Sequence, residues 1–158
     1  NATENGLADR LTVVTGDFRS LVRDYRGCDL VFANPPFYPL GQGHVSRDPE
    51  VRAAKFELHL TLHDLLLGGA AMLAGEGILC LIYPARRKEE LLATAETCGL
   101  FPRRLRDVAP FAAGQADRFL VELGRQAGEV LALPPLILFV RPGEYTPEMM
   151  DVLAGSDP

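Results

Sequence analysis

The segment Asp29-Leu30-Val31-Phe32-Ala33, followed directly by Asn34-Pro35-Pro36-Phe37, constrains the fold of this chain more than any other feature. An apolar run rich in β-branched and aromatic residues that stops at Asn and two prolines predicts a buried parallel strand with a rigid turn at its carboxyl end. In open α/β sheets, ligands bind beyond the carboxyl ends of the strands. We therefore expect residues 34–37 to lie at a binding site.

The residues of this turn suit a planar amino group. Asn34 supplies an amide oxygen as a hydrogen-bond acceptor, and the carbonyl of Pro35 would supply a second one. Because proline has no N–H and a fixed φ, these carbonyls are free to point into a cleft. Phe37 offers a flat apolar face on which a base can stack. The alternative is that the segment is only a proline-rich exit from a strand.

Asn-Pro-Pro followed by Phe or Tyr resembles the catalytic motif of class I S-adenosylmethionine-dependent methyltransferases that methylate exocyclic or amide nitrogens. Further segments are similar to the subgroup that methylates N6 of adenine in a valine tRNA, and they extend the resemblance over nearly the whole chain. These segments are residues 5–18, 55–57, 75–79, 83–84 and 143–147. The resemblance implies an α/β fold, a Rossmann-like sheet with helices on both faces, and S-adenosyl-L-methionine as the cofactor.

The resemblance also implies roles for individual residues. Asn34, Pro35 and Phe37 would hold the target nitrogen and its base, so they are the expected catalytic residues. Asp17 would accept a hydrogen bond from the adenine of the cofactor, and the N–H of Phe18 would donate to the same ring. Asn34 would contact the cofactor as well. From the residues alone, Asp17 fits an ordinary turn in which it caps the next helix equally well.

Substrate contacts are expected from Pro36, Tyr38 and His44, which lie in the turn and in the loop after it. The GxG pattern at residues 41–43 follows this turn and does not open a helix after a strand. It is therefore more typical of a flexible substrate loop than of a cofactor loop.

Two features that hold the cofactor in this superfamily are absent from the sequence. They are the glycine-rich loop after the first strand and the acidic residue after the second strand. We expect residues 1–158 to be the C-terminal part of a single methyltransferase domain, incomplete because its first strands are missing. This part alone should bind the cofactor poorly and be inactive.

The missing strands also affect the expected sheet. In the family the strand order is 3-2-1-4-5-7-6, so the strand over Asp29–Ala33 loses its usual neighbour. An uncovered apolar edge is a template for pairing with another chain. Two outcomes are open: the Leu11–Val14 strand lies directly beside Asp29–Ala33, or two copies associate through the exposed edge or exchange the N-terminal segment. Of these we expect association, as a homodimer through the exposed sheet edge.

The rest of the chain alternates patterns typical of strands and helices. The expected strands are Leu11–Val14, Ile78–Tyr83, an antiparallel pair of Arg103–Val108 with Arg118–Leu123, and Leu133–Val140. The expected helices are a short helix or turn over Phe18–Arg26, a long helix over Glu50–Leu73 ended by Gly75 and Gly77, and an amphipathic helix over Arg87–Cys98. Gly68 and Gly69 inside the long helix each cost about 1 kcal/mol relative to Ala, which indicates close packing against the sheet.

Composition limits the class of protein without naming its chemistry. With 47% hydrophobic and 23% charged residues, the 158-residue chain has the composition of a globular domain. We expect no membrane partner and a cytoplasmic location, because no stretch resembles a membrane span or a signal peptide. The three cysteines are widely spaced and form no metal-ligand pattern, so we expect reduced thiols and no metal.

The sequence therefore predicts methyl transfer from S-adenosylmethionine to N6 of adenine in tRNA. Two alternative target nitrogens would bind to the same two acceptors: N2 of guanine in ribosomal RNA and the amide of a protein glutamine. A third, of another class, is a noncatalytic interaction module with a methyltransferase-like fold. The net charge of −5 favours a protein substrate or the module, whereas residues 56–57 and 145–147 favour tRNA.

Overall fold

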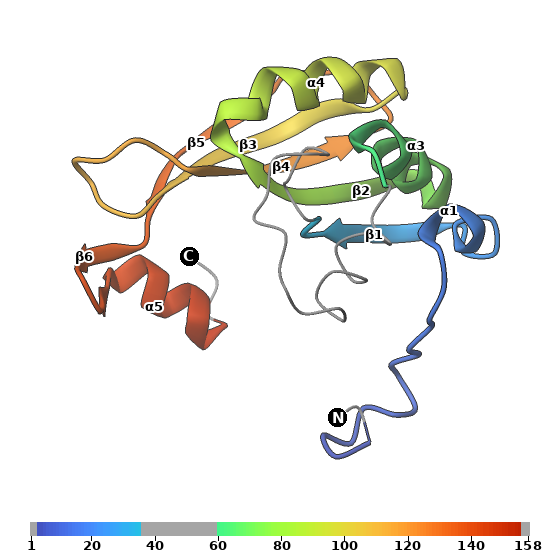
Figure 1. Cartoon of the computed structure of the whole chain (residues 1–158), viewed down its shortest axis with the longest axis horizontal. Coiled ribbons are helices and arrows are strands. Elements are labelled where there is room, and N and C mark those ends of the chain that lie inside the picture. The colour runs from blue at the N-terminus through green and yellow to red at the C-terminus, as the bar shows by residue number, and fades with distance from the viewer. Residues whose placement is uncertain (1–2, 36–59, 156–158) are drawn as a thin grey trace, which may run out of the picture.

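A computed structural model describes residues 3–35 and 60–155 of the chain. The main body is a five-stranded sheet with the spatial order β1-β2-β4-β3-β5 (Figure 1). Its strands are β1 (Cys28–Ala33), β2 (Leu73–Pro84), β3 (Phe101–Ala109), β4 (Arg118–Gly124) and β5 (Leu131–Ile137). β1 is parallel to β2 and β3 is parallel to β5, whereas β4 is antiparallel to both of its neighbours. It follows that β1, β2, β3 and β5 all point in the same direction.

This sheet confirms the α/β fold expected from the sequence. The motif strand is β1, the run at Ile78–Tyr83 lies in β2, and the expected antiparallel pair is β3 with β4. The order β1-β2-β4-β3 matches the 4-5-7-6 part of the expected strand order, and β5 is added beyond β3. The last expected strand is divided. β5 ends at Ile137, and β6 (Phe139–Arg141) pairs with β7 (Glu144–Tyr145) in a separate small sheet.

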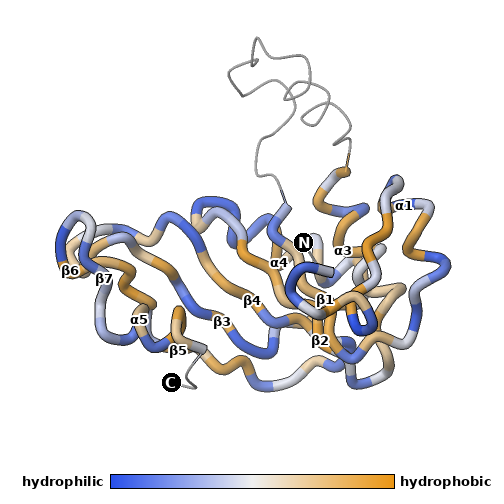
Figure 2. Tube along the Cα trace, turned by 90° about the horizontal axis from the view of Figure 1, so that it is seen from below, coloured by the Kyte–Doolittle hydropathy of each residue, from blue (hydrophilic) through white to orange (hydrophobic). Residues whose placement is uncertain are grey.

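The described helices lie mainly on one face of the five-stranded sheet (Figure 1). Helices α3 (Leu62–Met72) and α4 (Lys88–Thr97) cover that face, and the single turn η1 (Ala85–Arg87) joins β2 to α4. The short helix α1 (Phe18–Leu21) packs against α3, and α5 (Pro147–Ala154) lies beside β5. Figure 2 views the opposite face, where hydrophobic and hydrophilic residues lie side by side along the strands.

Helix α3 begins at a capping box and ends without a glycine. The N–H of Asp64 donates to Oγ1 of Thr61 over 3.0 Å, and the Thr61 N–H donates to the Asp64 carboxylate over 3.2 Å. The helix stops at Met72, because Leu73 is already extended and enters β2 directly. The sequence prediction that Gly75 and Gly77 end this helix is therefore wrong, since both lie inside β2. The first part of the predicted helix, residues 50–59, lies outside the described residues.

The hydrophobic core lies between the sheet and the two helices that cover it. Residues of odd number in β2 and β4 face this core, as the two-residue period of a strand requires. The largest fully buried side chains are Leu66, Leu79, Leu91, Leu100, Phe119, Val121 and Leu123.

Residues Leu11–Val14 do not form the strand that the sequence predicts. They have no strand assignment, and the side chains of Leu11, Val13 and Val14 are exposed. A strand needs a partner for its backbone N–H and C=O groups. Within the described residues β1 pairs only with β2, so the outer edge of β1 has no described partner.

Candidate functional site

The site predicted from the sequence lies where the four strands of common direction end. Their last residues, Ala33, Pro84, Ala109 and Ile137, belong to one edge of the sheet, which we call the carboxyl edge. Loops that leave such an edge are the usual location of ligand sites in α/β sheets. Asn34 follows β1 directly and therefore lies at this edge.

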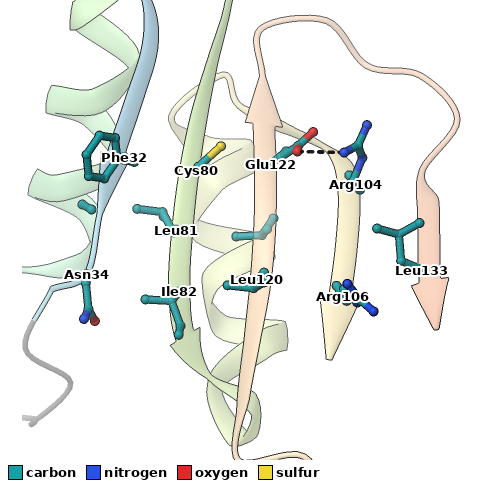
Figure 3. Close-up of a pocket in the computed structure, with 12 residues that line it drawn as sticks. Phe32, Asn34, Cys80, Leu81, Ile82, Arg104, Arg106, Leu120, Glu122 and Leu133 are labelled. Atoms are coloured by element: carbon teal, nitrogen blue, oxygen red, sulfur yellow. Dashed lines mark ion pairs between the residues drawn. The ribbon is translucent and has the colours of Figure 1, made fainter. Parts of the chain in front are cut away.

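Asn34 is exposed and available for binding. Side chains alternate along β1, so Asn34 and Phe32 lie on the face opposite to α3 and α4, with Ile82 and Leu120 from the adjacent strands (Figure 3). The Asn34 amide makes no hydrogen bond to any other residue in the described part of the chain. The N–H and C=O groups of this amide are thus not hydrogen-bonded to any described residue. Pro35, which follows immediately, is half-buried.

Asn34 lines a broad pocket of about 540 Å³ on this face (Figure 3). The pocket crosses the whole sheet from β1 to β5, and most of its lining is hydrophobic. The lining residues are Phe32, Ala33, Asn34, Cys80, Leu81, Ile82, Arg104, Arg106, Leu120, Val121, Glu122 and Leu133. Phe32 stands out because it is 80% exposed although it lies within β1.

Two arginines bring charge into this pocket, and each has an acidic partner. Arg104 of β3 pairs with Glu122 of β4 over 3.3 Å, and the side chains lie next to each other across the strands. Arg106 pairs with Glu148 of α5, and its Nε donates to the carbonyl of Pro134 over 2.9 Å. At the end of the pocket far from Asn34, the charges of both arginines are therefore neutralised by ion pairs.

The thiol of Cys80 lies between Phe32 and Glu122 in this pocket (Figure 3). Burial raises its pKa above the ordinary value, and the nearby Glu122 carboxylate raises it further. A thiol with a raised pKa stays protonated at neutral pH and is a weak nucleophile. Cys80 therefore contributes packing to the pocket and no reactive anion.

Asp17 caps the short helix α1, as the alternative prediction from the residues states. Its Oδ1 accepts from the backbone N–H of Arg19 over 2.9 Å, and the Arg19 guanidinium binds both carboxylate oxygens, over 3.0 and 2.6 Å. These hydrogen bonds from the Arg19 side chain are the main reason that the pKa of Asp17 falls to about 2. Asp17 is thus an exposed, fully ionised acceptor at neutral pH. Its proposed contact with the cofactor would compete with Arg19.

Phe18 has a structural role in addition to the one predicted for its N–H. A Cβ atom built on Gly68 of α3 would lie 2.5 Å from Cε1 of the Phe18 ring, so the ring lies directly against the helix backbone. The next residue, Gly69, approaches Leu79 of β2 in the same way, at 2.8 Å. The close packing expected of the two glycines is confirmed, and only Gly69 packs against the sheet.

The structure places part of the predicted site and adds residues to it. Asn34 and Pro35 lie at the carboxyl edge, and Asp17 and Phe18 form the start of α1. The remaining predicted residues, Pro36, Phe37, Tyr38 and His44, lie outside the described residues. The pocket residues on β3 and β4 are not among the predicted site residues. Their signal was the alternation in those two strands, which places Arg104 and Arg106 on the face opposite to the core.

Two other kinds of site are not found in the described part of the chain. Residues 3–35 and 60–155 contain no group of three metal-ligating side chains. None of their helices is long and apolar enough to cross a membrane.

Comparison with known proteins shows what the chain resembles. No protein-family model matches it. It is 31% identical over 125 residues to a tRNA1(Val) (adenine(37)-N6)-methyltransferase of Trichodesmium erythraeum, which covers 79% of this chain and 51% of that protein. It is 30% identical over 157 residues to the protein of the same name from Porphyromonas gingivalis, which covers 94% of this chain and 60% of that one. The chain thus spans between half and two thirds of the length of these relatives.

A solved structure supports the fold independently. The crystal structure of a predicted O-methyltransferase from Agrobacterium tumefaciens matches 97% of this chain and 67% of its own, with a TM-score of 0.66 and 18% sequence identity. At this identity the match shows the fold alone. By sequence the chain is similar to the tRNA1(Val) adenine N6-methyltransferases, and it shares the fold of the Agrobacterium tumefaciens protein.

Proposed function

We propose that the intact protein transfers a methyl group from S-adenosyl-L-methionine to N6 of adenine in a tRNA. The observation that carries this proposal is Asn34, whose exposed amide makes no hydrogen bond to another described residue at the end of β1. The two prolines and Phe37 follow it in the sequence. The relatives named for this reaction support the choice of adenine N6 and of tRNA.

The proposed chemistry requires acceptors more than a base. An aromatic amino nitrogen is a poor nucleophile, because its lone pair is delocalised into the ring. The Asn34 amide oxygen and the Pro35 carbonyl would accept its two hydrogens and favour the pyramidal nitrogen that forms as the methyl group arrives. This is preorganised electrostatic stabilisation, for which the loss of one group costs about 10²- to 10³-fold in rate. Phe37, by sequence, would stack on the base.

The cofactor would supply the electrophilic methyl group, and two residues of this chain suit it chemically. Asp17 is exposed and ionised, as an acceptor for the adenine amino group must be, and Asn34 has uncommitted polar atoms among the described residues. The glycine-rich loop and the ribose-binding carboxylate are not in this sequence. Residues 1–158 alone should therefore bind the cofactor poorly and be inactive.

The product of the reaction distinguishes the candidates. The intact protein is incubated with S-adenosylmethionine carrying a labelled methyl group, together with unmodified tRNA, ribosomal RNA or protein extract. Label recovered as N6-methyladenosine from tRNA supports the proposal. Label in N2-methylguanosine or in methylated glutamine would show that the same acceptors serve another substrate. A protein that binds partners but transfers no label would be the noncatalytic module.

The proposal includes the location and the assembly of the protein. A tRNA substrate assigns the reaction to the cytoplasm. In the 158-residue chain, a homodimer would form through β1, whose outer edge has no described partner and which carries the exposed side chains of Leu30 and Phe32.

A further inference from the structure

Three aromatic rings stack just beyond the ends of β3 and β5. The rings of Phe139 and Tyr145 lie nearly parallel, with centroids 4.9 Å apart and planes inclined by 19°. The ring of Phe111 lies on the same Phe139, with centroids 5.9 Å apart and planes inclined by 40°. These distances and angles are those of favourable aromatic pairs. We call these three residues the aromatic stack.

The two outer rings of the stack remain exposed. Phe139 belongs to both ring pairs and is half-buried, whereas Phe111 is 38% exposed and Tyr145 is 42% exposed. Exposed aromatic rings fixed in place by a neighbouring ring are suitable platforms for an unpaired base. Proteins that bind single-stranded RNA use such rings, because every base has a flat π face.

The stack lies at the same edge of the sheet as Asn34. Phe111 comes two residues after the end of β3, and Phe139 comes two residues after the end of β5. Both strands point in the same direction as β1, which ends at Ala33. Figure 1 shows β6 and α5 beyond the end of the sheet toward which the arrow of β1 points. The stack and Asn34 therefore occupy the carboxyl edge together.

The two sites are separated by the width of the sheet. β1 and β5 are its outer strands, so four interstrand spacings lie between them. At about 4.8 Å for each spacing, the distance is about 19 Å. A nucleic-acid strand with about 3.4 Å for each stacked nucleotide covers that distance in about five or six nucleotides. One short RNA segment can thus reach both sites.

Charge at the stack is compatible with a phosphate backbone. Arg141 of β6 has a side chain that is 76% exposed, and it pairs with Glu144 over 2.5 Å. Arg118, at the start of β4, pairs with Asp117 over 3.6 Å. The exposed ion pair of Arg141 with Glu144 contributes at most about 1 kcal/mol, so the Arg141 guanidinium can turn to a phosphate at little cost.

We infer that the aromatic stack binds an unpaired RNA base a few nucleotides from the target adenine. This inference rests on the proposed function, because it needs an RNA substrate whose target base lies at Asn34. Tyr145 and Phe111 provide the stacking faces, and Arg141 contacts the backbone. The stack thus anchors the substrate away from the reacting atoms and contributes to affinity without taking part in methyl transfer.

The test compares two tyrosines of equal exposure in the intact protein. Tyr145→Ala removes an outer ring, and Tyr145→Phe keeps it. Tyr25→Ala is the matched control, because Tyr25 is 41% exposed and lies three residues before β1, toward the opposite edge of the sheet. The dissociation constant of an unmodified tRNA transcript is measured for each variant, together with kcat, KM and the melting temperature.

We expect Tyr145→Ala to weaken tRNA binding by about 5- to 150-fold, which corresponds to about 1 to 3 kcal/mol. The KM for tRNA should rise while kcat at saturating tRNA is unchanged. Tyr145→Phe and Tyr25→Ala should bind as the wild type does. Unchanged tRNA affinity in Tyr145→Ala, or equal losses in Tyr145→Ala and Tyr25→Ala, would overturn the inference.

A second measurement covers the case in which Tyr145→Ala disturbs folding. The wild-type protein is crosslinked to tRNA containing 4-thiouridine, and the crosslinked peptides are identified. Crosslinks within residues 110–118 or 138–146 support the inference, and crosslinks confined to other segments would refute it. A protein that binds tRNA through the stack but yields no N6-methyladenosine would show that the stack binds RNA and would contradict the proposed reaction, so the two failures are distinguishable.

Discussion

The Phe18 ring lies against the backbone of Gly68, where an added Cβ would come within 2.5 Å of Cε1. This contact joins α1, which begins after Asp17, to the middle of α3. α3 in turn packs on β2 through Gly69 and Leu79. The position of Asp17 is therefore set by the contact of α1 with α3, which can be this close because Gly68 has no side chain.

The two glycines should respond differently to substitution by Ala. Ala gains about 1 kcal/mol of helix propensity at either position. At Gly69 the new Cβ would lie 2.8 Å from Leu79, which is fully buried, and overpacking of a core costs about 1 to 3 kcal/mol. We expect Gly69→Ala to lower the free energy of unfolding by about 1 kcal/mol. Gly68→Ala should change it less, because half-exposed Phe18 can move away. Urea denaturation of both variants measures this, and a Gly69→Ala variant more stable than the wild type would contradict the packing.

Replacement of Asn34 tests catalysis in the intact protein. Asn34→Ala removes the only side-chain acceptor that directly follows β1, so kcat should fall by at least about 10² while cofactor affinity changes little. Asn34→Asp keeps the size of the side chain and its acceptor oxygens, so it should lose less activity than Asn34→Ala. Single-turnover methylation of tRNA measures the rate, and calorimetry measures the affinity for the cofactor. An Asn34→Ala variant with wild-type turnover would remove Asn34 from the mechanism.

The pKa of Asp17 gives a prediction about pH. It is lowered from 3.8 to about 2, chiefly by hydrogen bonds from the Arg19 side chain. A carboxyl whose folded-state pKa is lowered stabilises the folded state above its unfolded pKa, and this contribution is lost as the pH falls through the folded value. The contribution of Asp17 should therefore be complete well above pH 3.8 and disappear as the pH approaches 2.

Arg19→Ala removes the main cause of this shift. We expect the pKa of Asp17 to rise toward 3.8 in that variant, as measured by the chemical shift of its carboxyl carbon during an acid titration. Arg23→Ala, at an exposed arginine in the same segment, is the control and should leave the pKa unchanged. A pKa that stays near 2 without Arg19 would show that the backbone N–H alone holds the carboxylate.

The outer edge of β1 predicts self-association of the 158-residue chain. Leu30 and Phe32 are exposed there, and apolar strand edges pair with one another. We expect sedimentation at micromolar concentration to show dimers or larger species, and we expect Phe32→Glu to dissociate them. Leu153→Glu is the control, because this residue of α5 is as exposed as Leu30, and it should not dissociate them. A stable monomer of 17.2 kDa for the unsubstituted chain would rule out association through this edge.

Much of the fold follows from local patterns in the sequence. β1 and its end at Asn34 are predictable because a run of Leu, Val, Phe and Ala meets two prolines, which cannot continue a ladder of hydrogen bonds. α4 is predictable from helical periodicity, and its end is predictable from Gly99. In the structure Gly99 has a positive φ of 70°, which suits glycine. The pairing of β3 with β4 follows from two alternating runs close together in the chain.

Other features depend on partners distant in sequence, and only the tertiary structure decided them. Leu11–Val14 has the composition of a strand, but a strand forms only beside another, and none of the described strands lies next to it. The contact of Phe18 with Gly68, which fixes α1 next to Asp17, joins two residues far apart in the chain. The aromatic stack brings together three residues from separate segments. Local backbone preferences determine each helix or strand separately, whereas the contacts between helices, strands and loops depend on the packing of the whole chain.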